Sequence, residues 1–162
     1  MRIGNIEFEH GLFLAPMAGV ADYAFRAACV EFGAECVCSE LISAKAVTYG
    51  DAKTALLAAL REEERPAAIQ IFGSDPAVMA AAAESLMRFR PAFIDINMGC
   101  PVPKLVKNGE GSALLRDPKR CGRIVAEVCR AVPVPVTVKI RRGYDAEDEN
   151  APEIAAICEQ NG

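Results

Sequence analysis

The sequence lacks any long hydrophobic run. No stretch of its 162 residues reaches the roughly 20 consecutive apolar residues that a membrane-spanning helix needs. The opening, MRIGNIEFEHG, carries charges and leads into no long apolar stretch, so we expect no signal peptide. These absences favour a chain that does not enter a membrane, and by default a cytoplasmic location.

Regular cysteine spacing is also missing. The seven cysteines lie mostly in apolar segments, and their spacing fits no disulfide framework, so we expect free thiols in a reducing compartment. The C-x-C pair of Cys36 and Cys38 is the one candidate for metal binding. Side chains alternate between the faces of a strand. We assign the two thiols to opposite faces and therefore expect no metal.

No internal repeat, low-complexity tract or Gly/Ser linker divides the chain. With 52% hydrophobic residues, the composition suits one domain with a substantial core. The net charge of −4 argues against a nucleic-acid binder, although the charge of a whole chain says little about one face. The dinucleotide signature G-x-G-x-x-G is absent as well, which argues against a doubly wound nucleotide-binding sheet.

What the sequence does contain is an alternation of strand-like and helix-like runs. The expected strands are residues 12–16, 35–40, 67–73, 92–99 and 134–143. The expected helices are residues 22–33, 74–89, 117–132 and 150–162, with residues 45–65 helical in part. This alternation predicts an α/β fold with a parallel sheet covered on both faces.

Local signals mark where several of these helices begin. Asp-Pro pairs at Asp75 and Asp117 place a capping carboxylate before a proline in the first helical turn, and Ser74 is an alternative cap for the helix that follows it. Asp22 is expected to cap the first helix, or alternatively to pair with Arg26 one turn along. The run REEER, residues 61–65, is expected to be a solvated turn.

Five βα units predict only part of a closed (β/α)8 TIM barrel, which has eight units and about 250 residues. The last residues, CEQNG, form a helix-ending pattern that ought to lead into a sixth strand. We therefore expect residues 1–162 to be the N-terminal portion of a barrel domain, with the remainder absent. A doubly wound open sheet is the alternative.

Polar residues stand at or just past the C-terminal ends of the apolar strands. They are Ser39 with Glu40, Gln70, Asp95 with Asn97, and Lys139. In parallel α/β folds this is the edge at which ligands bind. A thiol follows the fourth strand at once, because Cys100 lies in a loop that Pro101 and Pro103 stiffen.

Four segments carry a resemblance to a known family. LAPMAGVADYAFR, QIFGSDP, DINMGCPVPKLVKNGEGSALL and VPVTVKIRRG resemble the tRNA-dihydrouridine synthases, in order and along essentially the whole chain. The resemblance implies an FMN-binding (β/α)8 barrel followed by a helical tRNA-binding domain. It also implies reduction of the C5–C6 double bond of particular uridines in tRNA, with NADPH reducing the flavin.

The resemblance also implies roles for individual residues. The expected flavin contacts are Pro16, Met17 and Ala18 through backbone, Gln70 at the polar edge of the ring system, and Lys139 beside its N1/O2 side. The expected substrate contacts are Asn97 on the uracil and Lys104, Lys107, Arg141 and Arg142 on tRNA phosphates. Cys100 is the expected proton donor.

These residue types suit that chemistry. An ordinary thiol has a pKa of about 8.5, so it is mostly protonated at neutral pH and can act as an acid. A fixed lysine cation stabilises negative charge on a reduced flavin. Amides such as Gln70 and Asn97 both donate and accept, which suits the imide edges of flavin and uracil.

Simpler interpretations stay open for each residue. Cys100 could be an ordinary loop thiol, Lys139 a strand-end lysine reaching solvent, and the basic residues a solubilising rim. Gln70 and Asn97 could simply satisfy backbone groups of the loops. For the whole chain, the alternatives are an inactive partial barrel or an FMN barrel that reduces a free pyrimidine.

The sequence departs from the family pattern at two points. Ala21 stands where the family commonly has threonine. The family's later histidine and its helical domain would lie beyond Gly162, and the one histidine present, His10, precedes the first strand and matches no catalytic position.

Overall fold

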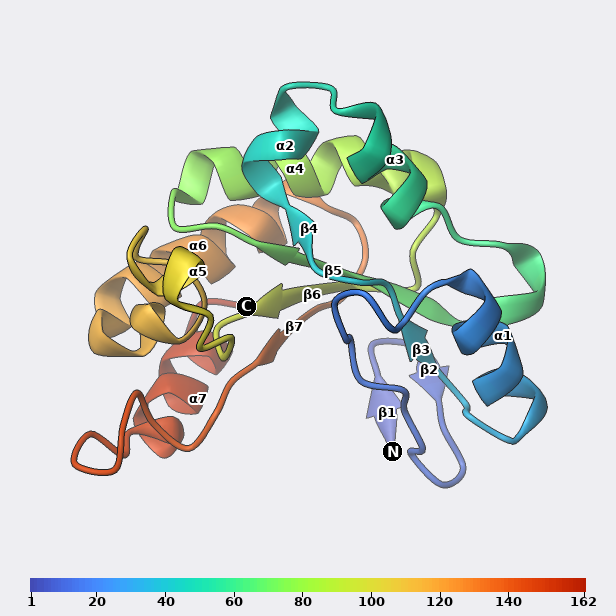
Figure 1. The fold of residues 1–162 in the computed structure, drawn as a ribbon. Coiled ribbons are helices and arrows are strands. Elements are labelled where there is room, and N and C mark those ends of the chain that lie inside the picture. The colour runs from blue at the N-terminus through green and yellow to red at the C-terminus, as the bar shows by residue number, and fades with distance from the viewer.

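The computed structural model describes residues 1–162 and shows helices around the outside of a curved sheet (Figure 1). The strands β3 (Val37–Cys38), β5 (Ala67–Phe72), β6 (Ile94–Asn97) and β7 (Val136–Lys139) pair in parallel in that order. The short strand β4 (Ile42–Ser43) extends the line of β3 along β5. Phe13 forms an isolated parallel bridge to Cys36 at the position of the first expected strand.

This strand order follows the order of the chain and never reverses. A doubly wound sheet has a switch point at which the strand order reverses, whereas a barrel adds each strand beside the last. The open sheet is therefore a partial barrel of parallel βα units, as the sequence predicts, and the doubly wound alternative is wrong. The sheet does not close on itself, because β7 ends the pairing path.

All of the expected helices are present, together with one short helix, Pro103–Val106, that the sequence does not predict. They are α1 (Tyr23–Glu31), α2 (Ala44–Thr48), α3 (Ala52–Ala58), α4 (Pro76–Leu86), α5 (Pro103–Val106), α6 (Pro118–Ala131) and α7 (Ala151–Gln160). Short 3-10 turns lie at Glu62–Glu64, Met87–Phe89 and Gly111–Arg116. The carboxylates of Asp22, Asp75 and Asp117 accept from backbone N–H groups three residues on, at 2.9–3.0 Å, so all three expected caps are confirmed. No helix is both long and apolar enough to cross a bilayer.

The two faces of the sheet differ in what covers them. Alternate residues such as Ile69, Ile94 and Ile96 face the helices and belong to a core of 20 buried residues that includes Met79 and Ile124. The helices lie around this outer face only (Figure 1). The expected cover on both faces is met by helices on the outer face only, because the inner face is the interior of the partial barrel.

A short hairpin that the sequence analysis misses covers part of this inner face. The strands β1 (Arg2–Ile3) and β2 (Ile6–Glu7) pair antiparallel, and Phe8 after them packs edge-on against Phe13, with ring centroids 4.7 Å apart. Phe8 shares a buried cluster with Ala68 and Phe93 at the amino-terminal ends of β5 and β6. The hairpin therefore forms an apolar floor under the strands.

The REEER segment is a solvated turn only in part, since Arg61, Glu62 and Glu63 are exposed but Glu64 is not. Glu64 is fully buried and accepts from Arg26 in a two-point ion pair, with Nε–Oε2 at 2.7 Å and Nη2–Oε1 at 3.1 Å. The guanidinium also donates to the carbonyl of Ala21 at 2.8 Å. Arg26 is thereby committed to Glu64, and Asp22 serves as the helix cap rather than as its ion-pair partner.

The assignment of Cys36 and Cys38 to opposite faces is also wrong. Residues two apart on a strand share a face, and both thiols belong to the inner cluster with Phe8. Burial raises the pKa of the Cys36 thiol to about 12 and that of Cys38 well above its usual value. The reason given for the absence of a metal therefore fails, and that absence stays a prediction.

Candidate active site

A cavity of about 330 Å³ opens at the carboxyl ends of β6 and β7. We call it the mouth cavity. It gathers six of the residues singled out from the sequence, from three separate segments of the chain: Pro16, Ala18, Asn97, Cys100, Lys139 and Arg141. The common edge of a parallel sheet explains this convergence, because every strand presents its last residues there.

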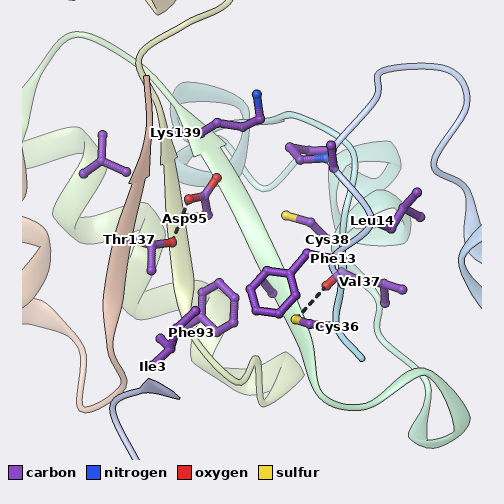
Figure 2. Close-up of a pocket in the computed structure, with 14 residues that line it drawn as sticks. Ile3, Phe13, Leu14, Cys36, Val37, Cys38, Phe93, Asp95, Thr137 and Lys139 are labelled. Atoms are coloured by element: carbon purple, nitrogen blue, oxygen red, sulfur yellow. Dashed lines mark hydrogen bonds between the residues drawn. The ribbon is translucent and has the colours of Figure 1, made fainter. Parts of the chain in front are cut away.

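A second cavity of about 280 Å³, the inner cavity, runs along the inner face of the sheet. Figure 2 shows Lys139 and Asp95 at one end, and Phe13, Phe93 and Ile3 at the other. Pro16 and Lys139 line both cavities. The inner face therefore changes from apolar at the hairpin floor to polar and charged at the mouth.

A row of polar side chains crosses the sheet just below the mouth. Gln70 on β5, Asp95 on β6 and Thr137 on β7 are register neighbours. Asp95 accepts from Thr137 Oγ1 at 2.6 Å, drawn in Figure 2, and from Gln70 Nε2 at 2.5 Å. Gln70 Oε1 in turn accepts from Asn97 Nδ2 at 2.9 Å. Parallel register thus assembles a continuous network from three strands.

Burial raises the pKa of the Asp95 carboxyl above its ordinary value. The hydrogen bonds from Thr137 and Gln70 and the positive charge of Lys139 act in the opposite direction and lower it. Lys139 itself is exposed at the end of β7. Its cation therefore has a carboxyl group behind it and open cavity in front of it.

The Cys100 loop is fixed through its backbone. Asn97 Oδ1 accepts from the N–H groups of Gly99 at 3.2 Å and Cys100 at 3.0 Å. The carbonyl of Cys100 accepts from Ser112 N at 2.9 Å. A Cβ on Gly111, whose φ is +60°, would lie 2.5 Å from the Cys100 carbonyl oxygen, so glycine is required for this close approach. The thiol is half-buried and lines the mouth cavity.

The loop after the first expected strand is also anchored. The carbonyl of Met17 accepts from the N–H groups of Val20 at 3.1 Å and Ala21 at 2.9 Å. The Glu40 carboxylate accepts from the N–H of Gly19. Pro16 and Ala18 therefore line the mouth cavity, whereas Met17 lies in the same turn without lining it. Glu40, expected at a strand end without a role, thus anchors this loop.

The two amides are less available than the sequence analysis expects. Gln70 is fully buried, and Asn97 is 7% exposed. The amide of Asn97 satisfies the Cys100 loop, as the simpler interpretation holds, and Asn97 also lines the mouth cavity. Gln70 lies one hydrogen bond further in, so it reaches the mouth cavity through Asn97.

The basic residues divide into two groups. Lys107 and Arg141 line a third cavity of about 400 Å³, together with Tyr144 and Ser112, and Arg141 borders the mouth cavity as well. Lys104 is exposed on α5 and lines neither cavity. Arg142 pairs with Glu149 at 2.9 Å. The structure thus brings Lys107 and Arg141 to the site and leaves Lys104 and Arg142 outside it.

Sequential parallel strands, an apolar floor and a polar mouth together define a partial (β/α) barrel with its ligand-binding end at the carboxyl edge. A sequence model of the family described as Dihydrouridine synthase (Dus) matches residues 13–162. The chain therefore belongs to the dihydrouridine synthase family.

Curated proteins agree with this membership. Over 162 residues the chain is 43% identical to tRNA-dihydrouridine synthase B of Pasteurella multocida and 42% identical to that of Pseudomonas aeruginosa. The protein of the same name from Vibrio cholerae is 41% identical over the same length. All of this chain is matched in each case, but only 49%, 49% and 50% of the relatives. The chain spans about half the length of the curated relatives it matches.

Proposed function

We propose that this chain forms the N-terminal portion of the catalytic barrel of a flavin-dependent tRNA-dihydrouridine synthase. The observation that carries the proposal is the meeting of Cys100 and Lys139 in one mouth cavity, beside the loop that holds Pro16 and Ala18. A proton donor and a fixed cation then face the same bound molecules. The relatives that match all 162 residues are named tRNA-dihydrouridine synthase B, which supports the proposal.

The residues at the mouth fit an FMN ring. Pro16 and Ala18 offer a close, rigid backbone edge, and Lys139 offers an exposed cation backed by a buried carboxyl group. Lys139 would hold the side of the ring at which negative charge collects. Gln70 would support the site from below through Asn97. Reduced by NADPH, bound FMN would supply the hydride for C6 of the uracil.

Cys100 then completes the reduction. Its thiol proton would pass to C5 of the uracil as the C5–C6 double bond is lost, and the thiolate would regain a proton from solvent. Asn97 would hold the uracil edge with the amide hydrogen that its bond to Gln70 leaves free. Both side chains line the mouth cavity, so one bound base can meet them together.

The substrate in this proposal is a uridine of tRNA. Because a base inside a stack cannot reach a cavity at the barrel mouth, the target uridine would be flipped out. Lys107 and Arg141, which line the neighbouring cavity, would hold its flanking phosphates, and Lys104 on α5 would add a more distant contact. The remainder of the barrel, the helical tRNA-binding domain and the cytoplasmic location belong to the same proposal.

The test separates the two half-reactions. The experiments use a protein of the same length as the curated relatives, which begins with this chain and which we call the complete enzyme. In it, Cys100→Ala should retain FMN and still be reduced by NADPH, because neither step needs an acid at that position. Oxidation by unmodified tRNA should slow by roughly 10²- to 10⁴-fold, as expected for the loss of a positioned general acid. Stopped-flow absorbance of the flavin follows both steps.

A matched control removes a different half-buried thiol. Cys29 lies on α1 and does not line the mouth cavity, so Cys29→Ala should leave both half-reactions unchanged. The role of Cys100 is falsified if its alanine variant is reoxidised by tRNA at the wild-type rate. Equal reoxidation by a free pyrimidine would instead indicate an FMN barrel with a small substrate.

A further inference from the structure

An unbroken chain of hydrogen bonds joins Asp95 to the backbone of the Cys100 loop. It runs from the Asp95 carboxylate to Gln70 Nε2 (2.5 Å), from Gln70 Oε1 to Asn97 Nδ2 (2.9 Å), and from Asn97 Oδ1 to Cys100 N (3.0 Å). Each of the two amides donates one hydrogen bond through its nitrogen and accepts the next through its oxygen. No role in the proposed reaction has so far fallen to Asp95.

The chemistry of the two ends fixes the direction of this chain. At the loop end, the N–H groups of Gly99 and Cys100 can only donate, so Asn97 must present its oxygen there. Its nitrogen then faces Gln70, which must answer with an oxygen, and the Gln70 nitrogen is left facing Asp95. An ionised carboxylate only accepts, so it matches this arrangement and opposes the flipped one.

We propose that Asp95 is a positioning residue, which orients the amides of Gln70 and Asn97 and thereby holds the Cys100 loop in place. Its meaning for catalysis rests on the proposed function. Its effect on the loop does not, because the effect follows from hydrogen bonding within the chain itself.

Burial makes this control strong. Gln70 is 0% exposed, Asn97 7% and Asp95 8%, so the Gln70 amide has no contact with bulk water and the loss of a partner is costly. The charged and titratable groups that act on Asp95 or feel its charge are Lys139, Cys36 and Cys38. Burial raises the pKa of Asp95, whereas the hydrogen bonds from Thr137 and Gln70 and the charge of Lys139 favour the ionised carboxylate.

The experiment replaces Asp95 with residues that do or do not accept. Asp95→Leu has the same branching and no acceptor, so the Gln70 amide loses what orients it. Asp95→Asn can still accept from Gln70 with its oxygen while its nitrogen donates to the Thr137 hydroxyl, so it should restore the wild-type behaviour. Thr137→Val is the matched control, because it removes the other donor to Asp95 and leaves the Gln70 branch intact.

Two measurements on the 162-residue chain report on the loop without using flavin or tRNA. In Asp95→Leu, the Cys100 amide should exchange with deuterium roughly 3- to 10-fold faster, the effect of one weakened hydrogen bond. Alkylation of the Cys100 thiol by iodoacetamide, followed by peptide mass spectrometry, should quicken to a similar extent. Cys121 is buried in the outer core and should stay protected, which verifies that the variant remains folded.

Gln70→Leu should reproduce the effect, and the double variant with Asp95→Leu should be no worse than either single one, since both act through one path. If Cys121 becomes reactive in Asp95→Leu, the smaller Asp95→Ala takes its place. Wild-type exchange and alkylation at Cys100 in a folded acceptor-free variant would overturn the proposal, as would failure of Asp95→Asn to restore them. A tRNA assay that fails while these readouts change would count against the proposed function alone.

Discussion

Glu64→Gln should destabilise the chain far more than the place of Glu64 in a run of charged residues suggests. The substitution leaves the Arg26 guanidinium buried at 3% exposure opposite a neutral partner. Stranding one member of a buried ion pair costs about 3–5 kcal/mol. The guanidinium keeps the carbonyl oxygens of Ala21 at 2.8 Å and Ala59 at 3.3 Å, so we expect the lower end, about 3 kcal/mol.

Urea unfolding followed by circular dichroism measures this loss. With a urea dependence of about 2 kcal/mol per molar for a chain of this size, the midpoint should fall by about 1.5 M. The matched control is Glu62→Gln, two residues away in the same turn. Glu62 is 75% exposed and pairs with Arg65 and Arg90, so it should cost less than about 1 kcal/mol. Similar midpoints for the two variants would refute the reasoning.

Three further predictions concern the site. The chain of 162 residues should bind FMN weakly or not at all, because β7 has no strand on its outer edge and the inner cavity is open; tight, stoichiometric quenching of flavin fluorescence would contradict this. Lys139→Met in the complete enzyme should lower the flavin's reduction potential and slow reduction by NADPH, and an unchanged potential in a dye-linked titration would place Lys139 elsewhere. Asp95 has a raised pKa in the fold, so it binds its proton more tightly there than in the unfolded chain. Its contribution to stability should therefore fall as the pH rises from the ordinary carboxyl pKa to the raised one. The urea midpoints of the wild type and of Asp95→Asn should differ at the alkaline end of this window and converge at its acidic end.

The strands and helix starts could be predicted from sequence because their causes are local. Apolar runs identify the strands, and Asp75 and Asp117 place a cap and a proline within two residues. The gathering of Asn97, Cys100 and Lys139 followed from a general rule, since parallel strands end at one edge. None of these predictions needed a contact between specific distant residues.

Other features depended on such contacts and were therefore missed. The charged run around Glu64 has the composition of a solvated turn. Only the structure shows that Glu64 is buried in an ion pair with Arg26, which is distant in the chain. The role of Asp95 depends on its register with Gln70 and Thr137, which no single strand reveals. The assignment of Cys36 and Cys38 was different in kind, because strand periodicity alone places them on one face.

The hairpin floor has a consequence for folding during synthesis of the chain. A Cβ on Gly4, in the hairpin, would lie 2.4 Å from the ring of Pro135, so the first residues of the chain fit against the residue that precedes β7. Pro135 is synthesised about 130 residues later, which at about 5–20 residues per second is roughly 6 to 26 seconds. Phe8 gains its buried neighbours earlier, when Phe93 is made about 85 residues after it, and until then a chaperone that shields aromatic surface would find Phe8 exposed.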